Sequence, residues 1–235
     1  KENTALICAE IKKAEQEGAK IIVLPELCIT GYTCSDLFLQ EKMLREARQA
    51  LLEIAAFTFA LDCIVFVGLP LEYNGKLYNV AAAVSNGKVL GFVPKTYLPN
   101  YNEFYEKRWF ASGFDFEFAQ PISFAGFDTQ IGDMIFDLGQ GAVLGIELCE
   151  DLWVPNPPSS TLVLQGANII ANLSASDEYV SKAQYRRELV SNQSARCICA
   201  YVYSGASVFE STTDLVFSGA TLVCENGAIL SEGER

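Results

Sequence analysis

Hydrophobic and polar positions along the chain predict helices that alternate with buried strands. Residues 3–18 show helical spacing, and the unbroken apolar run 21–24 that follows has the length of a buried strand. A second helix is predicted from Ser35 to Ala60, with Ser35 as its N-cap, before a strand at 63–69. The apolar positions of this second helix are Leu37, Leu39, Met43, Leu44, Leu51 and Ile54. Helices that alternate with strands along the chain are typical of an α/β protein.

The Asn-Gly dipeptides at 86–87 and 226–227 predict tight hairpins. Asn86-Gly87 separates two strand-like segments at 77–85 and 88–93. Asn and Gly adopt the positive φ angles that a two-residue turn requires, so the pair favours antiparallel neighbours. Asn226-Gly227 repeats this pattern later in the chain. Hairpins of this kind predict a mixed sheet or two sheets, in place of one purely parallel sheet.

The rest of the chain continues the alternation. Residues 94–113 are aromatic and charged without clear periodicity, which is typical of a loop that carries a site. The remaining predicted elements are strands at 130–136, 142–148, 169–173 and 199–203 and helices at 159–166 and 181–196. No linker or low-complexity stretch divides the sequence, so one α/β domain is predicted over residues 1–235.

Charge limits the partners. The 29 acidic and 17 basic residues give a net charge of −12, so no broad positive surface is available for nucleic acid or for an anionic membrane. The longest apolar runs are too short to span a bilayer. We therefore expect neither nucleic acid nor a membrane as a partner.

The absence of histidine narrows the chemistry. It excludes Ser-His, Cys-His and His-metal mechanisms and leaves Cys, Lys, Tyr, Ser, Asp and Glu. The eight cysteines contain no C-x-x-C pair of the kind that zinc or thioredoxin chemistry needs. We expect reduced thiols in a cytoplasmic protein, and no metal site.

Three polar side chains each follow the end of a predicted strand: Glu26, Lys95 and Cys149. Open α/β folds collect reacting groups at such strand ends, so the three are expected to meet in one cleft. Each alone has an ordinary explanation, as a solvated acid, a surface lysine and a small buried hydrophobe. Together they supply a proton acceptor, a cation and a nucleophile, which makes a catalytic site the sharper hypothesis.

The neighbours of Cys149 make the other two groups necessary. The carboxylates of Glu147, Glu150 and Asp151 would raise the pKa of the thiol and suppress the thiolate. Without histidine, Glu26 has to accept the thiol proton, and Lys95 has to supply positive charge to the thiolate and to an oxyanion.

These residues resemble the nitrilase, or carbon-nitrogen hydrolase, superfamily, whose members carry Glu, Lys and Cys in this order. Pro25-Glu26 precedes Gly31-Tyr32, Lys95 begins a K-x-x-L-P segment, and Cys149 ends a strand, as in the family. The family also has an acid before a basic-aromatic run, matched here by Glu106. The resemblance implies that Glu106 orients Lys95. It also implies a four-layer α-β-β-α sandwich with two mixed sheets between helix layers.

Within the superfamily, two stretches resemble the glutaminase domain of glutamine-dependent NAD synthetases. They are C-E-D-L-W at 149–153 and N-L-S-A-S at 172–176. The resemblance implies hydrolysis of the glutamine amide through a thioester on the cysteine, with a pocket for the glutamine amino and carboxylate groups. The residues implied for this pocket are Tyr101, Trp153, Ser176 and Lys182. The resemblance leads us to expect arginine in place of Lys182 in several relatives, and lysine cannot form the same two-pronged bond to a carboxylate.

The resemblance also sets expectations about what lies outside the chain. Family members begin with a strand before the first helix, so a central strand is expected to be missing ahead of Lys1. No S-G-G-x-D-S type loop is present, so the synthetase domain, with its ATP and magnesium, is expected to be absent. The resemblance implies that this domain itself needs no cofactor. The expected partners are glutamine, the synthetase domain that receives ammonia for NAD synthesis, and further copies in a homo-oligomer.

Other functions remain open from the sequence. A stand-alone amidase or nitrilase would act on a different amide or nitrile with the same residues. A non-catalytic interaction domain would keep the fold alone, but it is disfavoured because Glu26, Lys95, Glu106 and Cys149 are all present. A redox role for the cysteines is the poorest explanation, since only Cys197 and Cys199 are near neighbours in the sequence.

Overall fold

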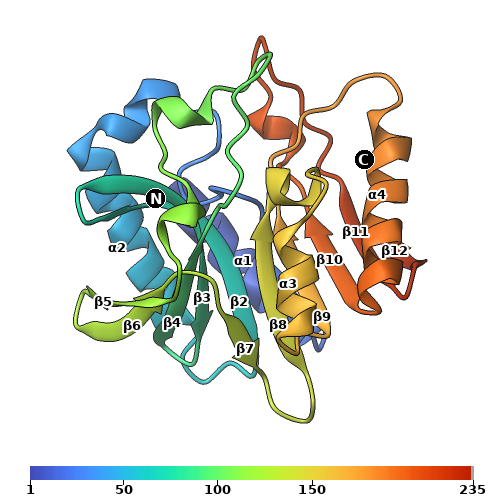
Figure 1. The fold of residues 1–235 in the computed structure, drawn as a ribbon. Coiled ribbons are helices and arrows are strands. Elements are labelled where there is room, and N and C mark those ends of the chain that lie inside the picture. Colours follow the sequence, from blue (N-terminus) through green and yellow to red (C-terminus); the bar gives the residue numbers. More distant parts are fainter. Residues whose placement is uncertain (234–235) are drawn as a thin grey trace.

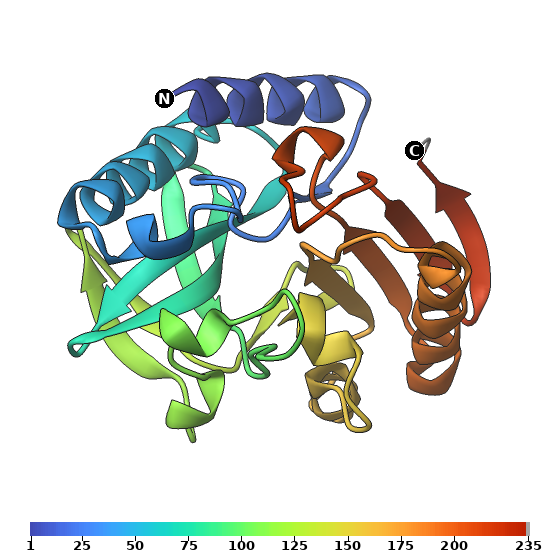
Figure 2. The ribbon, with the colours of Figure 1, turned by 90° about the horizontal axis from the view of Figure 1, so that it is seen from above.

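The computed structural model describes residues 1–233 and forms a four-layer α-β-β-α sandwich. Two six-stranded mixed sheets pack face to face, and helices cover the outer face of each (Figures 1 and 2). This architecture confirms the predicted fold class. It follows from the strands with two apolar faces, which have to be covered on both sides.

The first sheet has the strand order β1-β2-β3-β4-β6-β5. Its strands are β1 (Ile21–Val23), β2 (Ile64–Tyr73), β3 (Lys76–Ser85), β4 (Lys88–Pro94), β5 (Gln120–Phe124) and β6 (Phe127–Ile131). β1 runs parallel to β2, and β2, β3 and β4 form antiparallel hairpins. Helices α1 (Glu2–Gln16) and α2 (Glu41–Phe57) lie on its outer face.

The second sheet has the order β12-β11-β10-β9-β8-β7. Its strands are β7 (Ile135–Asp137), β8 (Val143–Leu148), β9 (Ile169–Leu173), β10 (Ala200–Ser204), β11 (Thr221–Glu225) and β12 (Ala228–Glu232). Helices α3 (Pro158–Leu164) and α4 (Lys182–Cys197) cover it. β8, β9 and β10 are parallel, so their carboxyl ends meet at one edge.

A dry core joins the two sheets. Phe66 of β2 and Ala81 of β3 belong to the same apolar cluster as Ile146 of β8 and Leu173 of β9, and none of the four is more than 1 % exposed. Such apolar contact fixes one sheet against the other. Groups at the ends of strands from both sheets therefore keep fixed positions.

Both predicted Asn-Gly hairpins are confirmed, and a third, at Asn74-Gly75 between β2 and β3, was not predicted. Asn86 and Gly87 have φ angles of 46° and 77°, and Asn226 and Gly227 have 49° and 87°. The first pair joins β3 to β4, and the second joins β11 to β12. The left-handed conformation of both residues is the reason for this sequence preference.

The predicted helix from Ser35 to Ala60 is wrong in its first part. Residues Ser35–Leu39 form a short 3-10 helix, Gln40 is extended, and α2 begins at Glu41. Ser35 caps nothing with its side chain and has a φ of 49°. The break turns Phe38 into an aromatic cluster with Trp109, while α2 faces the sheet. One straight helix cannot bury both surfaces.

The predicted strand at 130–136 is also wrong, because it spans two strands of different sheets. β6 ends at Ile131 and β7 begins at Ile135, with Gly132 between them at a φ of 139°. A Cβ on Gly132 would lie 2.8 Å from the Ala119 Cα atom, so the chain needs glycine to cross between sheets here. Strand β5 was not predicted.

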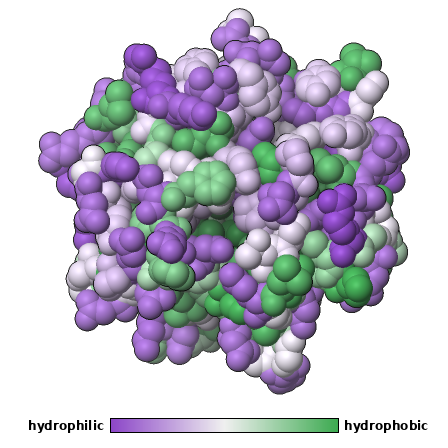
Figure 3. Space-filling view, viewed as in Figure 1, coloured by the Kyte–Doolittle hydropathy of each residue, from purple (hydrophilic) through white to green (hydrophobic). Residues whose placement is uncertain are grey.

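The surface is mixed in character. Figure 3 shows polar residues over most of one face, with apolar residues between them in small groups. Among residues 1–233, no helix has the length and apolar character that crossing a membrane requires.

Candidate active site

The three strand-end side chains lie at one end of the sandwich. Glu26 follows β1, Lys95 follows β4 directly, and Cys149 follows β8. The Glu26 N–H donates to the Ser174 carbonyl, beyond β9 of the other sheet, at 3.4 Å. The loops after both sheets therefore meet here, and the exposed fractions of Glu26, Lys95 and Cys149 are only 1 %, 0 % and 6 %.

Lys95 lies between two buried carboxylates. Its Nζ atom is 2.6 Å from Glu26 Oε1 and 2.7 Å from Glu106 Oε1. Asn79 Nδ2 also donates to Glu26 Oε1, at 2.6 Å, and the Tyr32 hydroxyl donates to Glu106 Oε1 at 2.7 Å. A buried ion pair is costly to break, so this arrangement holds the ammonium in one place.

One oxygen of each carboxylate remains without a hydrogen-bond partner. Glu26 Oε2 and Glu106 Oε2 are both buried and make no hydrogen bond within the described chain. Buried polar atoms are normally bonded, and exceptions are common where chemistry takes place. Glu26 therefore has one oxygen fixed by Lys95 and one free to accept a proton.

The turn that carries Glu26 depends on a close backbone approach. Leu27, the next residue, has a φ of 51°. A Cβ on Gly68 of β2 would lie 2.2 Å from the Leu27 backbone nitrogen, so only glycine lets the turn pack against the strand at this point. Strand β2 thus holds the turn that carries Glu26 in a fixed position.

The charges of the cluster alter its ionisation. Burial alone would lower the pKa of Lys95, but Glu106 and Glu26 outweigh it and raise that pKa well above its usual value. Burial raises the pKa of Glu106 to about 7, against the lowering effect of Lys95. Burial, followed by the charge of Glu26, raises the pKa of Cys149 to about 12, although Lys95 lowers it. The resting thiol is therefore protonated at neutral pH and needs a base.

Cys149 lies in a strained turn that hydrogen bonds hold. Its φ is 40°, which is unfavourable for a residue with a Cβ. Its N–H donates to Asn172 Oδ1 at 3.1 Å. Asp151 accepts from the N–H groups of Leu148 and Tyr97 at 2.9 and 2.7 Å. Asp151 therefore connects the cysteine turn with the loop after Lys95.

A small pocket of about 120 Å³ opens at Cys149. All four residues that the resemblance implied for substrate binding line it, namely Tyr101, Trp153, Ser176 and Lys182. The Tyr101 hydroxyl donates to Glu150, also in the pocket, at 3.0 Å. The volume suits a small polar molecule better than a drug-sized ligand.

Lys182 already has a partner in this pocket. Its ammonium forms an ion pair with Asp177 and lies over the rings of Trp153 and Tyr179, 5.1 and 4.8 Å from the ring centroids. A substrate carboxylate therefore has to share this cation with Asp177. The sequence reasoning missed Asp177, because nothing in its position distinguishes it from a solvated acid.

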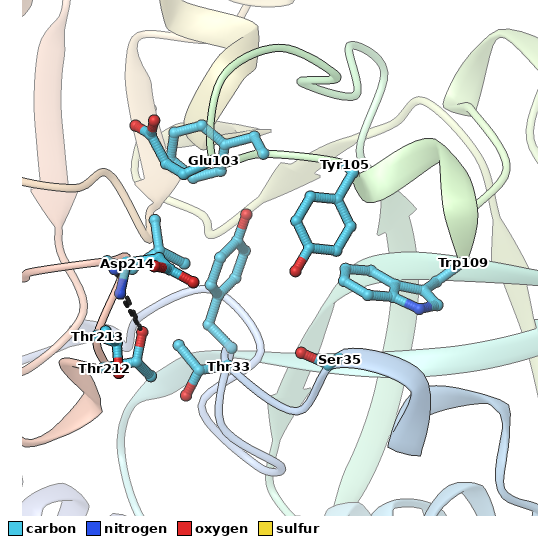
Figure 4. A pocket seen from close by; sticks show the side chains of 11 residues that line it. Thr33, Ser35, Glu103, Tyr105, Trp109, Thr212, Thr213 and Asp214 are labelled. Carbon is cyan, nitrogen blue, oxygen red and sulfur yellow. Dashed lines mark hydrogen bonds between the residues drawn. The ribbon is translucent and has the colours of Figure 1, made fainter.

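A second hollow, of about 200 Å³, lies beside the first and shares Glu103 and Phe104 with it. Figure 4 shows its side chains, with Tyr105 and Trp109 opposite Thr212 and Asp214. It contains no cysteine or lysine. The hollow at Cys149 is the candidate active site because only that one opens on the nucleophile.

Asn79 is a further residue that the sequence reasoning missed. It donates to Glu26 and is fully buried on β3, where its neighbours in the sequence are apolar. One amide inside the apolar run of a buried strand was the available signal, since such a group requires a partner.

The chain is similar to known proteins in sequence and in structure. The model of the carbon-nitrogen hydrolase family matches residues 1–233. The glutamine-dependent NAD(+) synthetase of Mycobacterium tuberculosis is 42 % identical over 236 residues, which cover 99 % of this chain and 34 % of that protein. The protein of the same name from Thermotoga maritima is 32 % identical over 226 residues, 95 % of this chain and 36 % of its own length. The chain thus spans about a third of the length of these relatives.

Solved structures of related proteins are similar to this chain over nearly its whole length. A glutamine-dependent NAD(+) synthetase from Cytophaga hutchinsonii superposes with a TM-score of 0.89 at 32 % identity, over 99 % of this chain and 38 % of that one. An amidase from Nesterenkonia superposes with a TM-score of 0.76 at 21 % identity, over 99 % of this chain and 80 % of that one. The second likeness supports the fold alone.

Proposed function

The chain belongs to the carbon-nitrogen hydrolase family, and we propose that within this family it is a glutamine amidohydrolase domain that releases ammonia for an NAD synthetase. One observation carries the proposal. Lys95 is bound between Glu26 and Glu106, and its charge acts on the thiol of Cys149, which lines a small pocket. The similarity to glutamine-dependent NAD(+) synthetases supports glutamine as the amide.

The first half of the reaction forms a thioester. Glu26 takes the proton of the Cys149 thiol as the sulfur attacks the amide carbon, and the Lys95 ammonium stabilises the oxyanion that develops. Glu26 then gives the proton to the departing nitrogen, the C–N bond breaks, and ammonia leaves. The free Glu26 Oε2 supports this role for the carboxylate.

The second half regenerates the thiol. Glu26 takes a proton from water, which attacks the thioester carbon, and Lys95 again stabilises the oxyanion. The C–S bond breaks, the proton passes to the sulfur, and glutamate leaves. Glu106 is a positioning residue in both halves, because it holds the ammonium of Lys95 at 2.7 Å.

The pocket fits the remainder of glutamine. Glu150 and Tyr101 offer a negative charge and a hydroxyl for the amino group, and Ser176 and Lys182 offer a hydroxyl and a cation for the carboxylate. Trp153 supplies an apolar wall for the methylene groups. A stand-alone amidase remains the alternative, and it would hydrolyse simple amides as well as glutamine.

The proposed function also implies partners for this domain. The whole protein would make NAD with a separate ATP- and magnesium-dependent synthetase domain, which receives the ammonia. We also expect a cytoplasmic homo-oligomer.

The direct test of the proposed function is release of ammonia and glutamate in equal amounts from glutamine, with simple amides hydrolysed poorly. Failure on glutamine with good activity on simple amides would favour the stand-alone amidase.

Lys95→Met should lower kcat by roughly 10²- to 10³-fold with little change in KM for glutamine, because the cation acts on an oxyanion present only after attack. Lys76→Met is the matched control, since Lys76 pairs with Asp115 at 2.8 Å on the surface. Steady-state ammonia release by both variants measures the difference, and circular dichroism verifies folding. Near-normal turnover would exclude this role for Lys95, and an effect on KM alone would show that Lys95 only binds substrate.

The activity should depend on the charge of Glu106. Its pKa is raised to about 7, so below that pH the carboxyl gains a proton and loosens its hold on Lys95. We expect kcat/KM to fall as the pH decreases through about 7. We expect Glu106→Gln to shift this fall, the acid limb of the profile of kcat/KM against pH. Identical limbs in the parent and in Glu106→Gln would assign the titration to another group of the cluster.

A further inference from the structure

A buried carboxylate that the proposed mechanism does not use lies on the strand that leads to the nucleophile. Glu147 is on β8, two residues before Cys149, and its exposed fraction is 1 %. It forms no ion pair within residues 1–233, and burial raises its pKa, against the hydrogen bonds that lower it. Burying an unpaired carboxyl group is unfavourable, so its retention needs a reason.

Its hydrogen bonds lead to the nucleophile. One oxygen, Glu147 Oε1, accepts from the Tyr201 hydroxyl, and the other accepts from the Ser159 N–H at 2.8 Å. The Tyr201 oxygen accepts from Asn172 Nδ2 at 3.0 Å. Asn172 Oδ1 accepts from the Cys149 N–H at 3.1 Å. All five residues of this chain of bonds are buried.

The direction of each bond follows from the two ends of this chain. A peptide N–H can only donate, so Asn172 has to present its oxygen to Cys149 and its amide nitrogen to Tyr201. Tyr201 then has to donate its own proton to Glu147. Both oxygens of Glu147 accept, which is the pattern of an ionised carboxylate. Glu147, through Tyr201, therefore supports the orientation in which Asn172 presents its oxygen to the nucleophile.

We propose that Glu147 is a positioning residue for the nucleophile and that it acts through Tyr201 and Asn172 on the backbone of Cys149. Cys149 has a φ of 40°, and its thiol is within electrostatic reach of Lys95 and Glu26. The bond from its N–H to Asn172 holds this unfavourable conformation. Misplacement of a reacting atom by about 1 Å can cost roughly 10²-fold in rate.

The test compares Tyr201→Phe with Glu147→Gln and with the double variant, in the full chain, using glutamine hydrolysis, and so rests on the proposed function. Tyr78→Phe is the matched control, because Tyr78 is also buried and its hydroxyl donates to Asp115 at 2.8 Å. We expect each single variant to lose about 10- to 100-fold in kcat, with KM within twofold of the parent. We expect the double variant to lose no more than about twofold beyond the poorer single, because both changes break one chain of bonds.

The proposal would be overturned if the single variants keep a kcat within twofold of the parent or lose activity only through KM. It would also be overturned if the double variant shows the product of the two single losses. Glu147→Gln keeps the shape of the side chain and decides the matter if Tyr201→Phe does not fold. If the parent itself does not hydrolyse glutamine, the proposed function fails, and the rate of Cys149 alkylation by iodoacetamide replaces kcat. Slower labelling of Cys149 in Tyr201→Phe than in Tyr78→Phe then supports the network, and equal rates overturn it.

Discussion

Cys149→Ala should abolish glutamine hydrolysis, with a loss of roughly 10⁶-fold in kcat, which is the size of effect known for removal of a catalytic nucleophile. No other thiol can replace it, because among the eight free cysteines only Cys149 is placed against Lys95 and Glu26. Ammonia release measured at saturating glutamine gives the value. A full-length protein with this change should still make NAD from free ammonia.

Cys63→Ala is the matched control. Cys63 is as buried as Cys149, each with an exposed fraction of 6 %, but it lies just before β2, at the strand's other end from the site. We expect this variant to keep its kcat. Loss of synthesis from free ammonia in Cys149→Ala, together with loss of hydrolysis, would contradict a role confined to the amide chemistry.

Glu26→Gln should reduce kcat by roughly 10²- to 10⁴-fold, because the side chain keeps its shape but no longer accepts a proton. Lys95 keeps Glu106 as a partner at 2.7 Å, so its charge remains compensated and the fold should persist. Both half-reactions need the base, so thioester formation and its hydrolysis should slow together. Single-turnover and steady-state rates measure the two halves.

Glu72→Gln, on the exposed end of β2, is the control for this change and should leave the rate unaltered. A Glu26→Gln variant that folds and hydrolyses glutamine at the parent rate would exclude Glu26 as the base. Because the resting pKa of Cys149 is about 12, another proton acceptor would then have to be found within the site.

Much of the fold could be predicted from local patterns. Buried runs such as that of β9 and turn pairs such as Asn86-Gly87 carry their own signals, because the residues that determine the conformation are adjacent. The break at Gln40 and the crossing at Gly132 could not be predicted in this way. Each depends on what the flanking residues bury in distant parts of the chain, such as Phe38 against Trp109.

The same division applies to the site. Glu26, Lys95 and Cys149 each follow an apolar strand, so their meeting could be predicted from the sequence. The role implied for Glu106 came from the resemblance alone. The amide of Asn79 stands out in an apolar strand, but the sequence does not show that its partner is Glu26. The contact of Lys182 with Asp177 gives no sequence signal, because each residue is ordinary in its own segment.

The central claim is that Cys149 attacks the amide carbon of glutamine. The most direct test is mass spectrometry after incubation with a glutamine analogue that carries an electrophilic carbon in place of the side-chain amide. We expect one adduct per chain, on the peptide that contains Cys149, with excess glutamine slowing its formation. Labelling of other cysteines in place of Cys149, or labelling that glutamine does not slow, would contradict the account.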